Sequence, residues 1–157
     1  MPNSIDISCK TLRVLHQKYI KYTPQKALVK NETMFLCNLT KATMIGCQTN
    51  SQKVYITTRV VKHLYDKRSA AQYDFIIQKL HQVIKFPDDV YLNKSGKRGK
   101  LGFCKKFDEI MLFASLEENT FNDNWKELYV VTVFETDTDY LKKCTLIWSW
   151  RGGNPSS

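Results

Sequence analysis

One histidine of the sequence stands among basic residues at helical spacing. Arg59, His63 and Lys67 are four residues apart, so on a helix their side chains would share one face. Asp66 is three residues from His63 and could also reach it. An imidazole can take up or release a proton near neutral pH, and a neutral imidazole among cations suits a general base beside a phosphodiester. The alternative is a solvated basic helix face with one incidental histidine.

A second set of basic residues falls within a predicted hairpin at residues 94–106. It comprises Lys94, Lys97, Arg98, Lys100, Lys105 and Lys106, with no acidic residue among them. Gly96 and Gly99 would let the backbone of the turn approach a ligand closely, and an arginine can hold a phosphate through two parallel hydrogen bonds. The alternative is a lysine-rich edge hairpin that resists aggregation.

The last predicted strand alternates hydroxyl and aromatic side chains. Thr145 and Ser149 would lie on one face, where their hydroxyls could position a phosphate, while Trp148 and Trp150 would lie on the other. Tryptophan stacks well on nucleobases, although Trp148 fits a place in the core better. We therefore expect Trp150, together with Tyr140 near a loop, to stack on bases.

The distribution of charge favours a polyanionic partner. The 157 residues carry a formal net charge of +9, but residues 1–106 carry +14 and residues 107–157 carry −5. Such asymmetry is typical of a chain with one positive face that binds nucleic acid, although solvated surface charge is the alternative. The expected nucleic-acid-binding residues are Arg59, Lys62, Lys94, Lys97, Lys100, Lys106, Tyr140 and Trp150.

Several other classes of protein are disfavoured by the sequence. The five cysteines, at positions 9, 37, 47, 104 and 144, include no C-x-x-C pair, and no cluster of cysteine and histidine has the spacing of a zinc site. We expect reduced, buried thiols, no metal and no cofactor. No apolar run is long enough to cross a membrane, and the first ten residues lack the pattern of a secretory signal, so a cytoplasmic protein is expected.

The candidate residues must be positioned by helices in the first half of the chain. We expect a helix over residues 10–22 that stops before Pro24, a hairpin of strands over 33–38 and 42–46, and a strand over 54–57. A helix over 58–67, capped by Thr58, would then carry His63. The helix over 70–85 has an apolar stripe formed by Tyr73, Ile76, Ile77, Leu80 and Ile84.

The second half predicts strands joined by short connections. The expected strands cover residues 90–93, 101–106, 109–116, 128–135 and 144–150. The expected turns and polar loops cover residues 95–99, 117–124 and 137–140, and residues 152–157 would form a loose tail. Helices followed by an antiparallel meander indicate the α+β class.

The order of four segments resembles a known nuclease superfamily. The segments are VYITTRVVKHLYDKR (54–68), FPDDVY (86–91), LGFCKK (101–106) and TLIWSWR (145–151). Together they resemble the barnase–EndoU–colicin–RelE-like nucleases, in particular the phage and mobile-element branches. The resemblance implies two helices followed by an antiparallel sheet of four to five strands over residues 54–151. Residues 1–53 would then be an N-terminal helical and β-hairpin extension packed on this domain.

The resemblance also implies metal-independent cleavage of RNA, in which the ribose 2′-hydroxyl attacks the adjacent phosphate. By this resemblance, His63 with Lys67 close behind would be the catalytic helix positions, and Lys105 or Arg98 the basic position of the sheet. Thr145, or less well Ser149, would be the hydroxyl of the final strand. The sequence departs from the family pattern in lacking a second suitably placed histidine, so the general acid stays open between Lys67, Tyr140 and another group.

Three functions follow as hypotheses. The first is a toxin-like endoribonuclease that acts on RNA, with tRNA as one option, and that an antitoxin or immunity protein would restrain. The second is a nucleic-acid-binding module without catalysis, whose binding would depend steeply on salt. The third is a basic interaction protein for an acidic partner. None of the three involves a membrane.

Overall fold

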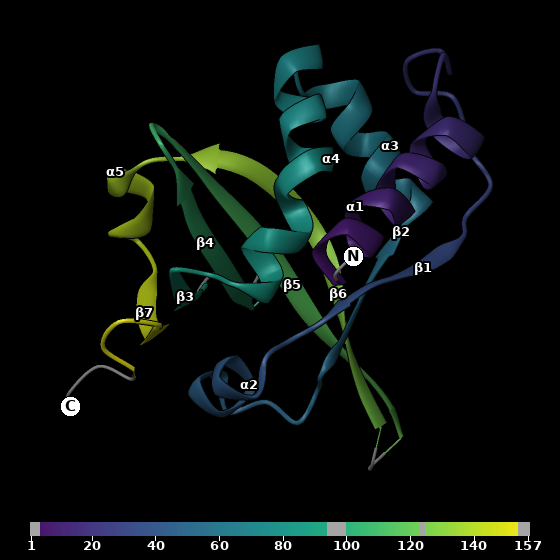
Figure 1. Cartoon of the computed structure of the whole chain (residues 1–157). Coiled ribbons are helices and arrows are strands. Elements are labelled where there is room, and N and C mark those ends of the chain that lie inside the picture. The colour runs from purple at the N-terminus through teal and green to yellow at the C-terminus, as the bar shows by residue number, and fades with distance from the viewer. Residues whose placement is uncertain (1–3, 94–99, 123–124, 154–157) are drawn as a thin grey trace.

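A computed structural model describes residues 4–93, 100–122 and 125–153 (Figure 1). The first half of the chain forms α1 (Ser4–Leu15), the π-helix η1 (His16–Ile20), β1 (Thr33–Asn38), α2 (Lys41–Cys47), β2 (Lys53–Thr57), α3 (Thr58–Lys67) and α4 (Ala70–Lys85). The second half forms β3 (Asp89–Leu92), β4 (Leu101–Phe107), β5 (Ile110–Asn122), β6 (Trp125–Thr136), α5 (Thr138–Leu141) and β7 (Thr145–Ser149).

The seven strands form one sheet in the order β1-β2-β6-β5-β4-β3-β7. Strands β2 and β6 run parallel, and every other neighbouring pair is antiparallel. Helix α4 packs against the middle of the sheet, α1 packs on α4, and α3 packs on β2 and β6 (Figure 1). The expected α+β class is confirmed, but the sheet has more strands than the four or five predicted, and α2 is a helix where a strand was expected.

Local signals in the sequence explain the two central helices. The side chain of Thr57 accepts a hydrogen bond from the backbone of Val60 and caps α3, while Ser69 forms a reciprocal capping box with Gln72 at the start of α4. Thr58, which was expected to be the cap, is instead buried and hydrogen-bonds to the backbone of Lys30 and Glu32. The predicted apolar stripe of α4 is buried along its whole length.

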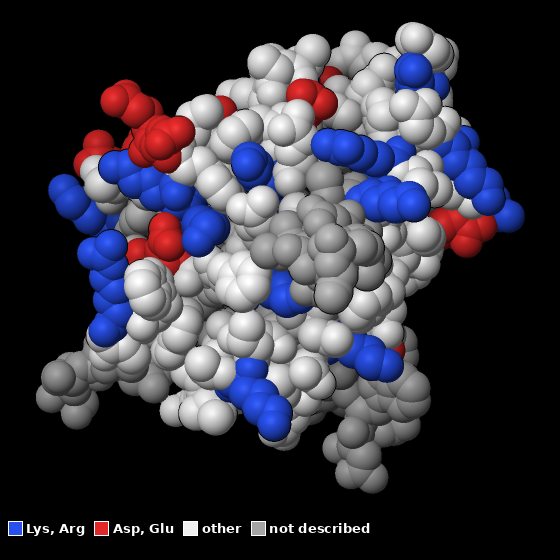
Figure 2. All heavy atoms as spheres, viewed as in Figure 1, with Lys and Arg blue, Asp and Glu red and all other residues white. Residues whose placement is uncertain are grey.

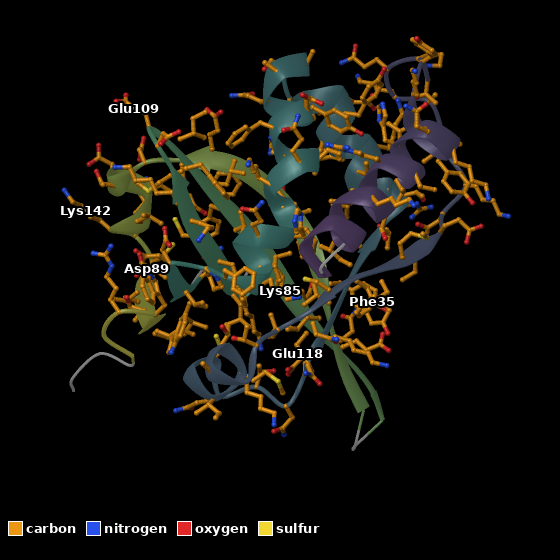
Figure 3. The ribbon with its side chains drawn as sticks, in the orientation of Figure 1. Phe35, Lys85, Asp89, Glu109, Glu118 and Lys142 are labelled. Carbon is orange, nitrogen blue, oxygen red and sulfur yellow. The ribbon has the colours of Figure 1, made fainter. Side chains whose placement is uncertain are left out.

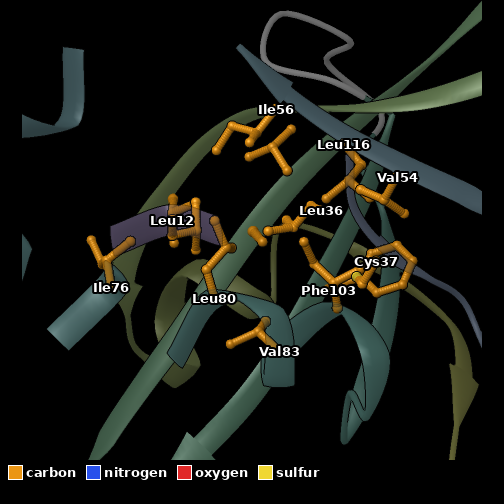
Figure 4. Packing of buried hydrophobic residues seen from close by; sticks show 14 of the residues in the cluster. Leu12, Leu36, Cys37, Val54, Ile56, Ile76, Leu80, Val83, Phe103 and Leu116 are labelled. Atoms are coloured by element: carbon orange, nitrogen blue, oxygen red, sulfur yellow. The ribbon is translucent and has the colours of Figure 1, made fainter. Parts of the chain in front are cut away.

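The core fills the space between these helices and one face of the sheet. Figure 4 shows side chains from α1, α4 and several strands meeting there, among them Leu12 of α1, Leu36 of β1 and Phe103 of β4. Each of the three is at most 1% exposed. Because α1 and β1 both contribute to this core, the segment before β2 is part of the same folded unit: β1 extends the sheet through β2, and α1 covers α4.

Three local predictions are wrong. Residues 42–46, expected to be a strand, lie within helix α2, because the Thr40 side chain caps the first turn and Gln48 closes the last turn in the left-handed conformation. Strand β1 therefore pairs with β2 rather than with residues 42–46. Residues 117–122, expected to be a loop, continue strand β5, since they pair along β6. Residues 138–141 form the short helix α5, capped by Asp137.

The other face of the sheet is covered by aromatic rings. Phe113 of β5 is fully buried between Phe134 of β6 and Tyr140 of α5, with ring centroids 5.2 Å and 5.4 Å away. Gly102 of β4 lies directly beside Phe113, and a Cβ atom placed on Gly102 would come within 1.9 Å of the Phe113 ring. The absence of a side chain at Gly102 is therefore a packing requirement.

We predict that Gly102→Ala destabilises the protein by about 1–3 kcal/mol, the usual cost of overpacking a filled core. Urea unfolding would measure the change. The matched control is Gly152→Ala, where a Cβ atom meets nothing within 4 Å. Equal midpoints for the two variants would contradict the packing described for Phe113.

Candidate functional site

Helix α3 presents the predicted basic and histidine residues together on its solvent side. Val61 and Leu64 are fully buried where α3 packs on β2 and β6. This packing leaves Arg59, His63 and Lys67 exposed on the opposite face of the helix. The structure therefore brings these three predicted residues together, as the spacing of four required.

Lys62, on the same helix, points the other way. Its side chain is only 6% exposed, and its ammonium lies 2.7 Å from a carboxylate oxygen of Asp66. The same ammonium donates a hydrogen bond of 2.7 Å to the carbonyl oxygen of Pro24. Lys62 is thus engaged inside the protein and is not on the exposed basic face where nucleic acid would meet Arg59.

Asp66 completes this buried ion pair. Burial would raise the pKa of Asp66, but hydrogen bonds from the Lys62 ammonium and the Lys26 backbone outweigh it, and the positive charges of Lys62 and His63 act in the same direction. The pKa of Asp66 is consequently lowered, and the carboxylate is held ionised. Asp66 therefore joins α3 to the segment that follows η1.

A second group of predicted residues meets around Asp88, between α4 and β3. The Lys105 ammonium donates to the carbonyl oxygen of Phe86 at 2.8 Å and lies 3.5 Å from the Asp88 carboxylate. The backbone of Lys106 donates to the same carboxylate at 2.8 Å, and the backbone of Trp150 donates to the Asp88 carbonyl at 3.1 Å. Lys105, Lys106 and Trp150 are thus neighbours.

A cavity of about 440 Å³ opens beside this group. Trp148 and the 60% exposed Trp150 line it from β7 and the residue after, while Lys85 and Phe86 line it from the end of α4. Figure 3 labels Lys85 between the end of α4 and helix α2. The cavity combines aromatic surface with cations, which is the composition expected of a site for nucleobases in single-stranded nucleic acid.

The remaining predicted residues have separate surroundings. Thr145 begins β7, where it pairs with Leu92 of β3, and it is half-buried. Tyr140 packs edge-on against Phe113 and Phe134, so its ring is part of the aromatic cover of the sheet. Lys100 is exposed just before β4. Lys94, Lys97 and Arg98 lie outside the described residues.

The two groups of predicted residues lie at different parts of the sheet. Helix α3 contacts β2 and β6, whereas Thr145 is on β7 at the sheet's edge, with β5, β4 and β3 in between. Neighbouring strands are about 4.8 Å apart, so β6 and β7 are separated by roughly 19 Å. The structure does not bring Thr145 or Lys105 to His63. Figure 2, which shows the molecule in the orientation of Figure 1, has basic side chains on both the left and the right of the surface, with acidic side chains among them.

A cleft on the helical side of the molecule contains His16, a residue that spacing and motifs did not mark as a candidate. It measures about 890 Å³ and lies between α1 and η1 on one side and α3 and α4 on the other. Nδ1 of His16 is 2.8 Å from the phenolic oxygen of Tyr73, which comes from α4. The residues that line the cleft are Arg13, His16, Gln17, Lys21, Thr23, Gln25, Tyr65, Asp66, Ala70, Tyr73, Asp74, Ile77 and Gln78.

The cleft shifts the protonation of both partners in this hydrogen bond. Burial and the nearby charge of Lys21 lower the pKa of His16, and the smaller opposing effect of Asp74 does not compensate. Burial also raises the pKa of Tyr73, with help from Tyr65 and Asp74. At neutral pH the site therefore holds a neutral imidazole against a neutral phenol, and both pKa shifts disfavour transfer of a proton from Tyr73 to His16.

The four cysteines whose side chains the structure describes offer no nucleophile. Burial raises the pKa of Cys37, Cys47 and Cys104 to about 12 each, and that of Cys144 is also raised. These four cysteines are free thiols, and a thiolate would be needed for reactivity. Over residues 4–93, 100–122 and 125–153, no group of three or more His, Cys, Asp or Glu side chains is arranged to hold a metal ion. No helix in these ranges is long and apolar enough to span a membrane.

Comparison with known proteins identifies the family. The model of the phage-Barnase-EndoU-ColicinE5/D-RelE like nuclease3 family matches residues 37–143, which is more than half of the chain. The chain belongs to this family of nucleases, and the resemblance suggested by its sequence is confirmed. No curated protein and no solved structure matches the chain. The matched range includes α3 with His63 and α4 with Tyr73, but not His16.

We predict that Lys62→Met destabilises the protein by about 1–3 kcal/mol, because it leaves the Asp66 carboxylate without its cation in a poorly solvated place. Urea unfolding at pH 7 would measure the loss. Lys67→Met is the matched control, since it removes an exposed lysine from the same helix. Similar small losses for both variants would mean that the Lys62–Asp66 pair does not stabilise the fold.

The lowered pKa of His16 also predicts how stability depends on pH. Below about pH 6.5 the unfolded chain takes up a proton at this residue while the folded chain resists it. The free energy of unfolding should therefore fall as the pH decreases from 7 to 5, and His16→Gln should flatten this part of the curve. Urea midpoints at pH 5, 6, 7 and 8 would measure it. Parallel curves for the two proteins would contradict a lowered pKa for the half-buried His16.

Proposed function

We propose that this nuclease-family protein is a metal-independent endoribonuclease, in which the ribose 2′-hydroxyl attacks the adjacent phosphate. The observation that carries the proposal is the exposed face of α3, where Arg59, His63 and Lys67 stand together inside the segment that matches the nuclease family. RNA cleavage of this kind needs a proton acceptor near the 2′-hydroxyl, a proton donor at the leaving oxygen and cations at the phosphate.

The proposed roles follow from side-chain chemistry. His63 acts as the general base or the general acid, because an imidazole can exchange a proton near neutral pH. Arg59 and Lys67, one turn away on either side, would stabilise the negative charge that develops on the phosphate. Arg98 remains part of the proposal as a further phosphate-binding residue from the hairpin.

Residues in the β4-β3-β7 half of the sheet are proposed to bind the RNA away from the reacting phosphate. Lys105, Lys106 and Trp150 meet around Asp88 beside the aromatic cavity, and Thr145 and Lys100 belong to the same half of the sheet. A single strand that extends from α3 to this edge could contact both regions. Lys94 and Lys97 are proposed to add charge from the hairpin.

The biological role proposed is that of a toxin acting on cellular RNA, with tRNA as one substrate. A nuclease of this kind would need restraint in the cell that makes it, and an acidic antitoxin or immunity protein would complement the net charge of +9. The cytoplasm is where such a substrate is met.

A binding module without catalysis is the second candidate. What favours it is the separation of Thr145 and Lys105 from His63, which leaves α3 to supply the chemistry without a group from β4 or β7. Such a module would bind RNA with steep salt dependence and leave it intact. A protein that meets only an acidic partner would not retard RNA at all.

We predict that the purified protein cleaves single-stranded RNA in the presence of EDTA and leaves 2′,3′-cyclic phosphate ends. His63→Gln should lower the rate at least about 100-fold, the smaller end of what acid–base catalysis contributes. Lys41→Gln, which removes an exposed lysine from α2, is the control and should cleave at the wild-type rate.

Gel separation of labelled RNA, with mapping of the product ends, would measure both rates. Wild-type cleavage that His63→Gln leaves unchanged would remove His63 from the mechanism. RNA that stays intact but is retarded by the wild-type protein would favour the binding module.

A further inference from the structure

The cleft that holds His16 is built partly by residues that precede the segment matching the nuclease family. Arg13, His16 and Lys21 come from α1, η1 and the residue that follows, whereas Tyr65 and Tyr73 come from α3 and α4 within the matched segment. At about 890 Å³, the cleft is within the size range of small-molecule sites. The N-terminal segment thus adds a wall and creates an open cleft beside α3.

Three rings pack against one another in this cleft. The centroid of His16 is 5.8 Å from that of Tyr65 and 5.4 Å from that of Tyr73, and the two tyrosines are 5.2 Å apart. The hydrogen bond to Tyr73 fixes the imidazole through Nδ1, and Nε2 makes no hydrogen bond with any other described residue. The cluster therefore offers aromatic surface for a planar ring and one ring nitrogen for a polar contact.

Two cations line the same cleft. Arg13 and Lys21 are exposed, and neither forms an ion pair within the part of the chain that the structure describes. The cleft also holds two carboxylates, but Asp66 is paired with Lys62, and Asp74 accepts a hydrogen bond of 2.8 Å from Gln78. An anionic group would therefore be drawn to the wall formed by Arg13 and Lys21.

The π-helix explains why two of these residues share the cleft. The backbone of Lys21 donates to the carbonyl of His16 at 2.9 Å, a bond that spans five residues. In a regular α-helix, residues five apart are separated by about 140° around the axis, whereas a wider π-type turn brings them closer to the same side. The wider turn thus lets both His16 and Lys21 line the cleft.

We propose that this cleft binds one nucleotide, with its base against the rings of His16 and Tyr65 and its phosphate at Arg13 and Lys21. The glutamine amides of the lining, from Gln17, Gln25 and Gln78, can donate and accept hydrogen bonds at the edge of a base. The choice of a nucleotide as the ligand class rests on the proposed function; the cleft, its rings and its cations do not depend on it.

The cleft adjoins the exposed face of α3 at one residue. Asp66 lines the cleft, and it is near enough to His63 for the charge of that histidine to lower its pKa. A nucleotide held in the cleft would place the neighbouring part of its RNA strand toward Arg59, His63 and Lys67. The cleft is therefore a specificity pocket for a base close to the proposed cleavage point.

The test is a titration of the full-length protein, with labelled histidine and tyrosine side chains, followed by NMR. The probe is adenosine 5′-monophosphate, with adenosine and inorganic phosphate as separate arms. We expect the monophosphate to shift the ring signals of His16, Tyr65 and Tyr73 in a saturable manner, and adenosine or phosphate alone to bind at least about 10-fold more weakly. The double variant Arg13→Gln, Lys21→Gln should weaken binding of the monophosphate about 10-fold or more, because each substitution removes a charged hydrogen bond to the phosphate.

The substituted side chains are exposed, so the variant should keep its fold, and Lys41→Gln is the matched control with unchanged affinity. No saturable shift at His16 up to about 10 mM monophosphate, or equal affinity in the Arg13 and Lys21 variant, would overturn the proposal. Because the titration measures binding alone, cleavage of RNA without this shift would refute the pocket and leave the nuclease standing. A saturable shift at His16 without cleavage of RNA would support the pocket and refute the nuclease.

Discussion

The ammonium of Lys62 lies between the Asp66 carboxylate and the carbonyl oxygen of Pro24, each 2.7 Å away. The same carboxylate accepts a hydrogen bond from the backbone of Lys26. These contacts connect the segment after η1 to helix α3 at two points, and they do so where neither charge is well solvated. A buried pair of this kind holds its surroundings in one arrangement, because either charge left alone would be costly. The position of η1 relative to α3, and hence the width of the cleft, depends on it.

The same helix divides two functions between its faces. Toward the protein, Lys62 and Asp66 hold the N-terminal segment in place; toward solvent, Arg59, His63 and Lys67 remain available for a ligand. Helical geometry makes this division possible, since residues four apart share a face and residues one apart do not. A single turn of α3 therefore carries both the structural ion pair and the proposed reacting residues, so loss of the Lys62 contacts would alter the position of His63.

Periodicity in the sequence was sufficient to predict α3 and α4, because their apolar residues are local signals, but the cap of α3 is Thr57 and not the expected Thr58. The strand predicted over residues 42–46 was wrong, because a short apolar run does not distinguish a strand from a short helix. The ends of α2 are defined by the cap geometry of Thr40 and Gln48, which the apolar run does not show. The grouping of Arg59 with His63 followed from spacing. The pairing of His16 with Tyr73 could not be predicted from spacing, because 57 residues separate them and only the packing of α1 on α4 brings them together. The one local signal was the histidine within a predicted helix next to aromatic and basic residues.

Membership of a nuclease family defines the chemistry that the common domain supports, but not the substrate that a given chain selects. Residues 37–143 carry the family match, and they contain the proposed reacting face of α3. Arg13, His16 and Lys21 precede that match and still form one wall of the cleft of about 890 Å³. An added segment that packs beside a reacting surface can change which ligand is held there without altering the groups that react. The N-terminal segment of this chain is therefore the part of the structure in which substrate selection would reside, and the Lys62–Asp66 pair is what keeps it in register with α3.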